Sequence, residues 1–422
     1  MMKHLLYFAM TLLLVVTGCS DNDDRVEIVN PSPKEQWGKT LVGGDGTIFA
    51  YPDLYVNYWE YTWSTEQHSD LVLRIKGAFP KARFFSFSLY DDEKGEAIGG
   101  FADNEIVPDD GSVNPFVVTS SDQGSFTVYI VPSAMDDSQV RRLGSPNVCR
   151  VKEGVRRATI VVREYLGVDE YGGVELPSIE AMDRNTMEEV AAPIRMNSNV
   201  TSFDVSYSHL WSDERDEMPF FLATRGAYYP NNSTDYLFAR TILKDDQVLV
   251  FSFVPVTIPK TVEEYKTAHA RYWSICFGSA RDTHSYYSVY DEQAAVPDGE
   301  ACTFVVCMQQ NQDLEAVRHK VEAEKAKGGH WQLVVWDRER KSVEGNAIGD
   351  CIVTMYRNIL PDKSWEYSIS SMIPTPYGDP VNTAQENPDK MIARRALGKY
   401  GPHGWKYITA EFLADQWTER NE

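Results

Sequence analysis

The sequence lacks an excess of basic residues. Its 41 Lys and Arg residues stand against 62 Asp and Glu residues, which gives a formal net charge of −21 over 422 residues. Nucleic acids and anionic membranes attract proteins through clustered Lys and Arg side chains. The charge balance disfavours both, so we expect no nucleic-acid partner. Beyond the N-terminus, no apolar run reaches the roughly 20 residues that span a bilayer.

The common catalytic and cofactor motifs are also missing. There is no phosphate-binding glycine loop, no dinucleotide fingerprint, no G-x-S-x-G or H-E-x-x-H motif and no EF-hand loop. The six Cys residues include no C-x-x-C pair, the usual start of a structural zinc site. We therefore expect neither a cofactor nor a metal, and ATP-driven, nicotinamide-dependent and zinc-protease functions are disfavoured. A glycosidase with paired carboxylates stays open, because such pairs meet only in three dimensions.

What is present begins with a short apolar segment at the N-terminus. Residues 5–16 follow Lys3 and as a helix would span about 18 Å, less than a bilayer core of about 30 Å. The run ends in Val-Thr-Gly-Cys at residues 16–19, which resembles the lipobox of bacterial lipoproteins. The resemblance implies that residues 1–18 are a signal peptide and that Cys19 is acylated, with the lipid bilayer as its partner. The alternative is an ordinary secretory signal next to an unrelated Cys.

An acidic stretch follows this Cys. Residues 20–24 read Ser-Asp-Asn-Asp-Asp, which resembles the surface-export tag of Bacteroidetes lipoproteins. The resemblance implies an outer-membrane lipoprotein exposed at the cell surface, with a periplasm-facing orientation as the alternative. We assign residues 19–36 to an acidic linker.

The other five Cys residues predict free thiols. An odd number excludes complete pairing within the chain, and four of the five lie in strand-like apolar runs, where Cys behaves as a small buried hydrophobe. One disulfide between Cys302 and Cys351 is the alternative.

Six short segments recur in the same order in the two halves of the chain. Residues 83–87 (Arg-Phe-Phe-Ser-Phe) resemble residues 271–275 (Arg-Tyr-Trp-Ser-Ile), and residues 163–166 (Arg-Glu-Tyr-Leu) resemble residues 357–360 (Arg-Asn-Ile-Leu). This order indicates two copies of one domain. The other matched pairs are 51–52 with 229–230, 70–73 with 246–249, 105–111 with 292–299, and 125–129 with 302–306.

Charged residues recur within these segments. They either form a carboxylate-recognition or acid–base cluster in each copy or support the fold by holding turns and strand ends. The matched residues are Arg83, Glu105 and Arg163 in the first copy, with Arg271, Glu292 and Arg357 in the second.

Short runs rich in Val, Ile, Phe, Tyr and Thr alternate with turn residues such as Pro-Asp-Asp-Gly at 108–111. This pattern predicts a mostly β protein with two tandem jelly-roll-like β-sandwich domains from an internal duplication, few short helices and a helical C-terminal extension. The predicted helices span 314–327, 388–399 and 409–420. The predicted domains are 37–195 and 196–375, followed by the extension at 376–422.

Three segments of the second copy carry a family resemblance. They are Arg-Tyr-Trp-Ser at 271–274, Tyr-Asp-Glu-Gln at 290–293 and Arg-Asn-Ile-Leu-Pro at 357–361. They resemble uncharacterised bacterial secreted proteins that carry tandem β-sandwich domains of unknown function. The resemblance implies the fold and brings no activity with it.

Two groups of side chains are candidates for ligand binding. Trp59 and Trp63 lie in the most aromatic segment, 55–63, and point the same way in a strand. They predict either a platform for sugar rings or the inner face of a sandwich.

A basic cluster stands against the overall negative charge and predicts either a patch for an acidic sugar, sulfate or phosphate or a pair of solvated strand edges. The cluster also includes Arg150, Lys152 and Arg163, and its candidate binding residues are Arg141, Arg142, Arg156 and Arg157.

A third group suggests chemistry. His284, Tyr286 and Tyr287 lie close in sequence to Asp282 and Asp291. A His within reach of a Tyr and a carboxylate can act as a general acid or base, as in lyases and hydrolases. The alternative is a packed aromatic hairpin.

Three functions follow as hypotheses. The first is a membrane-anchored lipoprotein that binds a carbohydrate or another envelope ligand. The second is a polysaccharide lyase or glycoside hydrolase with a cleft between the two copies, and the third is a non-catalytic structural or assembly protein. The sequence names no protein partner.

Overall fold

The computed structural model describes residues 30–39, 51–120, 122–198, 215–222, 229–342, 345–375 and 384–417. The signal peptide and Cys19 predicted at the N-terminus lie outside these residues.

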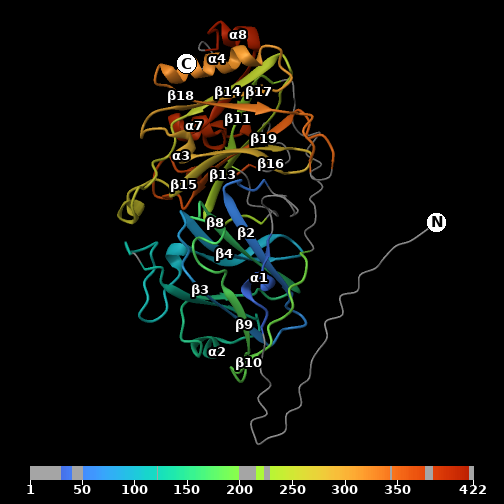
Figure 1. The fold of residues 1–422 in the computed structure, drawn as a ribbon, viewed down its shortest axis with the longest axis vertical. Coiled ribbons are helices and arrows are strands. Elements are labelled where there is room, and N and C mark those ends of the chain that lie inside the picture. The colour runs from blue at the N-terminus through green and yellow to red at the C-terminus, as the bar shows by residue number, and fades with distance from the viewer. Residues whose placement is uncertain are drawn as a thin grey trace, which may run out of the picture.

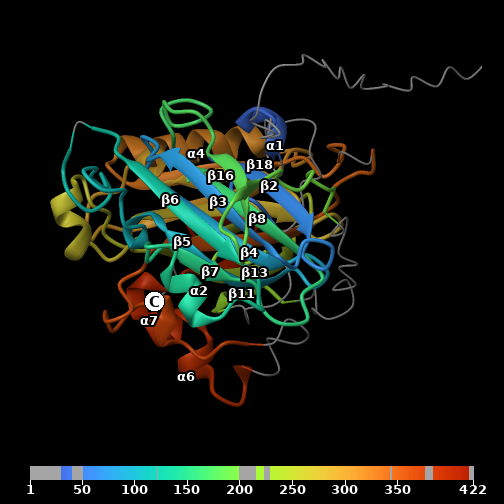
Figure 2. The ribbon, with the colours of Figure 1, turned by 90° about the horizontal axis from the view of Figure 1, so that it is seen from below.

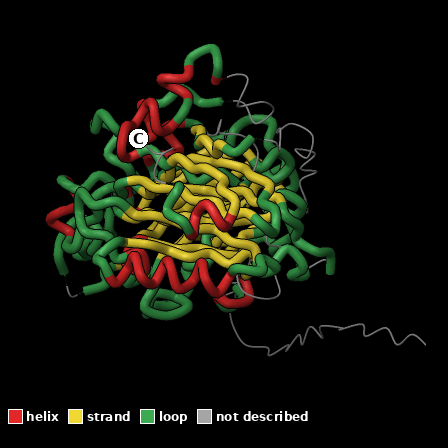
Figure 3. The backbone as a smooth tube through the Cα atoms, turned by 90° about the horizontal axis from the view of Figure 1, so that it is seen from above, coloured by secondary structure: helices red, strands yellow, loops and turns green. Residues whose placement is uncertain are grey.

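Within the described residues, four five-stranded β-sheets are stacked along the long axis of the molecule (Figure 1). The helices are few and short, so the predicted mostly β fold class is confirmed. Seen from above, the strands cross the middle of the molecule and the longest helix lies along one side (Figure 3).

The first two sheets form the first sandwich. Its inner sheet has the order β1-β2-β8-β4-β5, and its outer sheet, which faces the viewer in Figure 2, has the order β10-β9-β3-β6-β7. The elements are α1 (Pro33–Gln36), β1 (Gly38–Lys39), β2 (Val56–Ser64), β3 (Leu71–Ala78), β4 (Phe84–Asp91), β5 (Glu96–Ala102), β6 (Ser125–Val131), α2 (Asp137–Arg141), β7 (Val148–Arg150), β8 (Arg157–Tyr165), β9 (Ser178–Asp183) and β10 (Glu189–Val190).

The other two sheets form the second sandwich. Its inner sheet has the order β12-β13-β19-β15-β16, and its outer sheet has the order β11-β20-β14-β17-β18. The strands are β11 (Glu217–Pro219), β12 (Phe221–Leu222), β13 (Thr234–Ile242), β14 (Gln247–Phe253), β15 (Tyr272–Ser279), β16 (Ser285–Tyr290), β17 (Cys302–Met308), β18 (His330–Trp336), β19 (Cys351–Ile359) and β20 (His403–Ile408). The helices are α3 (Asp291–Ala294), α4 (Leu314–Ala326), α6 (Pro388–Met391), α7 (Ala393–Leu397) and α8 (Thr409–Leu413).

The two sandwiches repeat the same strand order. In the inner sheets, β2, β8, β4 and β5 occupy the places of β13, β19, β15 and β16. In the outer sheets, β9, β3 and β6 occupy the places of β20, β14 and β17, and a parallel pair, β6–β7 or β17–β18, ends each sheet. This repeated order is what an internal duplication predicts, and it lets the residues of the two copies be matched by strand register.

The C-terminal residues differ from the predicted extension. Strand β20 lies between β11 and β14 inside the second outer sheet and corresponds to β9 of the first copy. The connection from β19 to β20 is much longer than the connection from β8 to β9, so the repeat could not be followed there at a constant spacing. Helix α4 agrees with the prediction for 314–327. The predicted helix 388–399 is divided into α6, α7 and a 3-10 turn at Gly398–Tyr400, and the last predicted helix ends at Leu413.

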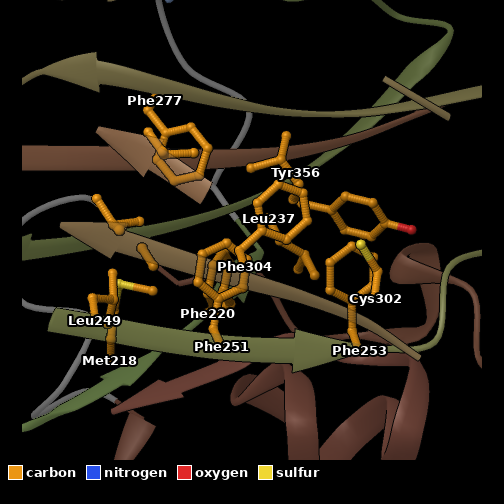
Figure 4. Packing of buried hydrophobic residues seen from close by; sticks show 14 of the residues in the cluster. Met218, Phe220, Leu237, Leu249, Phe251, Phe253, Phe277, Cys302, Phe304 and Tyr356 are labelled. Atoms are coloured by element: carbon orange, nitrogen blue, oxygen red, sulfur yellow. The ribbon is translucent and has the colours of Figure 1, made fainter. Parts of the chain in front are cut away.

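Strand β4 contributes side chains to two hydrophobic cores, one on each face. Its odd-numbered residues Phe85, Phe87 and Leu89 pack into the first sandwich, whereas Phe84 and Tyr90 pack towards the second. All eight residues are buried because sheets cover both faces. The second sandwich has its own aromatic core, in which the rings of Phe251 and Phe304 stack at 4.9 Å (Figure 4).

Candidate functional site

The inner sheets of the two sandwiches meet in a buried interface. Its apolar part includes Val56, Phe84, Tyr165, Tyr272 and Ile359, none of which is more than 2% exposed. Polar groups lose their hydration in such a place, so they need partners within the protein.

Two Arg residues, one in each copy, supply such partners to backbone carbonyl oxygens of the other copy. Arg163 of the first copy donates to the carbonyl oxygen of Tyr229 in the second at 2.9 Å, and its counterpart Arg357 donates to the carbonyl oxygen of Tyr51 in the first. Tyr51 and Tyr229 both have left-handed backbone angles, with φ of 49° and 51°. Such angles persist in non-glycine residues where the surroundings hold them, so each copy fixes a turn of the other.

Two ion pairs also join the copies, and each copy contributes the Arg of one pair and the Asp of the other. Arg271 of the second copy binds Asp103 of the first, and Arg83 of the first copy binds Asp291 of the second at 3.4 Å. The Arg residues matched in the sequence therefore join the two sandwiches. Burial raises the pKa of Asp103 to about 6, although the neighbouring Arg271 guanidinium opposes that change.

Strand register corrects one residue pair matched in the sequence. The N–H of Ala102 donates to the Glu105 carboxylate at 2.8 Å, and the N–H of Tyr290 donates to the Gln293 side chain at 3.4 Å. Gln293, and not Glu292, is therefore the counterpart of Glu105. The one-residue offset arises because the acidic residue directly after β16, Asp291, takes the place of Asp103.

The interface has two equivalent edges, and one of them is filled. There the rings of Tyr55 and Tyr290 pack at 4.6 Å, and the Gln293 amide donates to the Tyr55 hydroxyl at 2.6 Å. The next residue, Val56, is buried below them. We call this edge the closed notch.

The other edge is open. Register places Ser233 at the position of Tyr55, Ala102 at that of Tyr290 and Thr234 at that of Val56. Because neither Ser233 nor Ala102 carries a tyrosine ring, a hollow of about 260 Å³ lies at this edge, and we call it the inter-domain pocket. Its wall also contains Phe87, Ser88, Gly99, Gly100, Phe101, Glu105, Asn232, Asp235, Leu360, Pro361 and Lys363.

The inter-domain pocket combines hydrogen-bonding groups of both kinds. Thr234 is 1% exposed, and its hydroxyl has no hydrogen-bond partner among the described residues. Ser88 accepts from the buried Arg163 at 2.8 Å, so its position is fixed. The wall also holds the exposed Glu105 and Lys363, whereas Asp235 is 5% exposed and its carboxylate accepts from the Ser370 hydroxyl. The arrangement suits a small polar molecule.

A second hollow of about 550 Å³ lies between β5 and the residues around β7, and we call it the lateral groove. In the second sandwich the corresponding place is filled by Tyr286 and Tyr287, whose rings lie 6.0 and 5.8 Å from that of Trp336. Register matches these two Tyr residues with Ile98 and Gly99. Residues 98–101, Ser133 and 148–153 line the groove.

The predicted aromatic platform is not at the surface. Trp59 and Trp63 are 2% and 4% exposed and pack in the core of the first sandwich. Both faces of β2 are covered, because its sheet lies between the first outer sheet and the second sandwich. The two tryptophans therefore offer no face to a ligand.

The four Arg residues of the predicted basic patch lie in two separate pairs. Arg141 and Arg142 are exposed at the end of α2. Arg156 pairs with Glu93 at 2.8 Å, and Arg157 pairs with the buried Asp92 at 3.1 Å. The second pair is thus neutralised by carboxylates, and neither pair lines the inter-domain pocket or the lateral groove.

The residues of the predicted acid–base group have structural partners. His284 is 6% exposed and lies 3.7 Å from the Asp282 carboxylate, which also accepts from Tyr286 at 2.5 Å. Tyr287 packs on Trp336, as described above. Neither the inter-domain pocket nor the lateral groove includes His284, Tyr286 or Tyr287, so the structure places them in a packed hairpin.

Sequence reasoning missed the residues of the inter-domain pocket. A signal was present, because residues 54–56 read Leu-Tyr-Val in the first copy and residues 232–234 read Asn-Ser-Thr at the equivalent place in the second. Such an exchange of apolar for polar residues marks where two copies differ. It gains meaning only when the interface shows that both segments face the other sandwich.

Comparison with known proteins finds similarity only to solved structures, among them two bacterial proteins. No protein-family model matches it, and no curated protein matches it. An uncharacterised protein from Burkholderia cenocepacia is similar in structure, with 10% identity, 86% of this chain and 79% of that chain covered, and a TM-score of 0.47. A protein from Vibrio parahaemolyticus is similar with 8% identity, 73% and 85% coverage, and a TM-score of 0.38.

Two features are absent from the described residues. No described helix is long and apolar enough to cross a bilayer. No group of three or more His, Cys, Asp or Glu side chains within the described ranges is arranged to hold a metal ion.

Proposed function

We propose that this protein is a lipid-anchored outer-membrane protein that faces the cell surface and binds a carbohydrate in the inter-domain pocket without catalysis. One observation carries the proposal. At the two equivalent edges of the interface, Tyr55 and Tyr290 close one, whereas Ser233 and Ala102 leave the other open. A hollow at one of two otherwise matching edges is a natural place for a ligand.

The lining of the pocket favours a hydroxyl-rich ligand. Sugar hydroxyls both donate and accept, so they can bond to the Glu105 carboxylate, to the Thr234 hydroxyl and to the Lys363 ammonium group. Partly exposed Phe101 adds an apolar surface for the C–H face of a sugar ring. Charges of both signs lie in the wall, which disfavours a strongly charged ligand.

The frame around the pocket supports binding without large movement. Buried Arg163 and Arg357 and the two inter-domain ion pairs hold the walls in register from both sides. A preorganised site loses less conformational entropy when it binds its ligand. The anchor itself rests on the lipobox resemblance of residues 16–19.

A glycan screen tests the proposal. The detergent-solubilised protein is applied to neutral and acidic polysaccharides, and binding is quantified by isothermal titration calorimetry. Ala102→Tyr combined with Ser233→Tyr copies the closed notch into the pocket and is expected to weaken glycan binding at least 10-fold. The matched control, Tyr55→Ser with Tyr290→Ala, alters the closed notch and is expected to leave the affinity unchanged. Failure to bind any glycan, or equal affinity of the filled variant, contradicts the proposal.

A further inference from the structure

The inter-domain pocket and the lateral groove lie on the two sides of the same edge strand. Strand β5 pairs with β4 and ends its sheet, so its other edge faces outward. Gly99, Gly100 and Phe101 line both hollows. Because both hollows are lined by these residues, they lie next to each other on β5, and we call the pair the β5 depression.

Two glycines let β5 lie close to its neighbours between the pocket and the groove. A Cβ atom on Gly99 would lie 2.2 Å from the Sγ of Cys149, and one on Gly100 would lie 2.4 Å from the carbonyl oxygen of Phe87. Neither residue tolerates a side chain there, because real Cβ atoms do not approach other atoms so closely. The strand therefore packs tightly against its neighbours, with Cys149 Sγ over Gly99 and the Phe87 carbonyl oxygen beside Gly100.

The size of the β5 depression exceeds one sugar ring. The inter-domain pocket alone, at about 260 Å³, lies below the range of roughly 300–1,000 Å³ typical of small-molecule sites. The lateral groove adds about 550 Å³. The combined space suits several linked residues.

The charges along the β5 depression balance. The pocket contributes Glu105, Asp235 and Lys363, and the groove contributes Arg150, Lys152 and Glu153. The first set has one more negative group, and the second has one more positive group. An uncharged chain meets no net repulsion along this path, whereas a polyanion faces the carboxylates of the pocket.

From these features we infer that the β5 depression binds several consecutive residues of a neutral polysaccharide, which runs from the inter-domain pocket across β5 into the lateral groove. The inference rests on the proposed carbohydrate-binding function and specifies its ligand class. In the second sandwich Tyr286, Tyr287 and Trp336 fill the place that corresponds to the groove, so the second copy offers no such path there.

Chain length is the decisive variable in the test. Titration calorimetry is run with xylan, mannan, starch and β-1,4-glucan fragments of two and of six residues. At least one six-residue fragment is expected to bind 10-fold or more tightly than its two-residue fragment. Ile98→Tyr places the residue of the second copy in the groove and is expected to lower the affinity for the six-residue fragment to that for the two-residue fragment. The matched control, Tyr286→Ile, is expected to change neither affinity.

The outcomes separate this inference from the proposed function. Equal affinities for short and long fragments, both lost in the Ala102→Tyr/Ser233→Tyr variant, overturn the extended chain and leave the carbohydrate pocket in place. Tighter binding of six-residue polygalacturonate than of any neutral fragment overturns the neutral class. Absence of binding to every fragment overturns the inference and the proposed function together.

Discussion

Arg271 and Asp103 form a buried ion pair between the two sandwiches, with side chains 5% and 0% exposed. The equivalent pair, Arg83 and Asp291, joins the sandwiches in the opposite sense with side chains 17% and 6% exposed. Each copy thus contributes one Arg and one Asp. Matched Arg–Asp pairs therefore join the two sandwiches on both sides. The open edge is a place where the two copies differ.

The exposure of the two pairs predicts unequal effects of mutation. Asp103→Asn leaves the Arg271 guanidinium buried without its carboxylate, and we expect a loss of about 3–5 kcal/mol in the free energy of unfolding. Asp291→Asn should cost clearly less, because Arg83 keeps its ion pair with Glu292. Urea unfolding of both variants measures the difference. Equal losses would show that the two pairs support the interface alike.

Glu164 predicts a pH dependence of stability. Burial raises the pKa of this carboxyl to about 8, and nearby Asp169 adds to the effect. The side chain is 2% exposed, and its Oε1 has no hydrogen-bond partner among the described residues. The folded protein therefore keeps a proton that the unfolded chain releases at about pH 4.5. The contribution of Glu164 to the free energy of unfolding is therefore greatest below about pH 4.5. It falls as the pH rises from there to about 8 and is constant above pH 8.

Glu164→Gln removes this titration and keeps the shape of the side chain. We expect the variant to gain stability over the parent protein by up to about 1.4 kcal/mol per pH unit between pH 5 and pH 8. Unfolding free energies from urea titrations at pH 5, 6.5 and 8 measure the gain. Glu175→Gln, at an exposed position, serves as the control and should give a curve parallel to that of the parent. A parallel curve for Glu164→Gln as well would disprove the assignment.

The thiols of the described residues should be unreactive in the folded protein. The structure confirms the predicted free Cys residues, all of which are buried. Burial raises the pKa of Cys149 and Cys276 to about 11 and that of Cys302 and Cys307 to about 12, so thiolate is scarce at pH 8. A thiol reagent such as Ellman's reagent should titrate none of them in the native protein and all five in guanidinium under non-reducing conditions. Fewer than five after unfolding would indicate a disulfide.

Attachment to the membrane is predicted to depend on one residue. Cys19→Ser removes the acceptor of the lipid in the proposed lipobox, and we expect the protein to lose incorporation of labelled palmitate and to leave the membrane fraction. Ser20→Ala keeps the Cys and serves as the control. Unchanged labelling of the Cys19→Ser variant would refute acylation at this position.

The sequence anticipated the strands because their causes are local. Alternating residues such as Phe85, Phe87 and Leu89, and turn residues such as those at 108–111, specify an extended chain and its ends whatever lies nearby. Recurrence of short segments indicated two copies for the same reason. Helix α4 could also be predicted, since its apolar spacing and the Gly residues after it lie within one segment.

The chain by itself determined its β class and the buried state of its thiols, and it predicted a repeat with which the matching strand orders of the two sandwiches agree. The tertiary structure alone decided that Trp59 and Trp63 are buried, that β20 completes a sheet, and that Ala102 and Ser233 stand together at an open edge while Tyr55 and Tyr290 close the other. Local periodicity tells that a strand has two faces. It does not tell which distant segment covers each face, because that depends on packing between residues far apart in the chain.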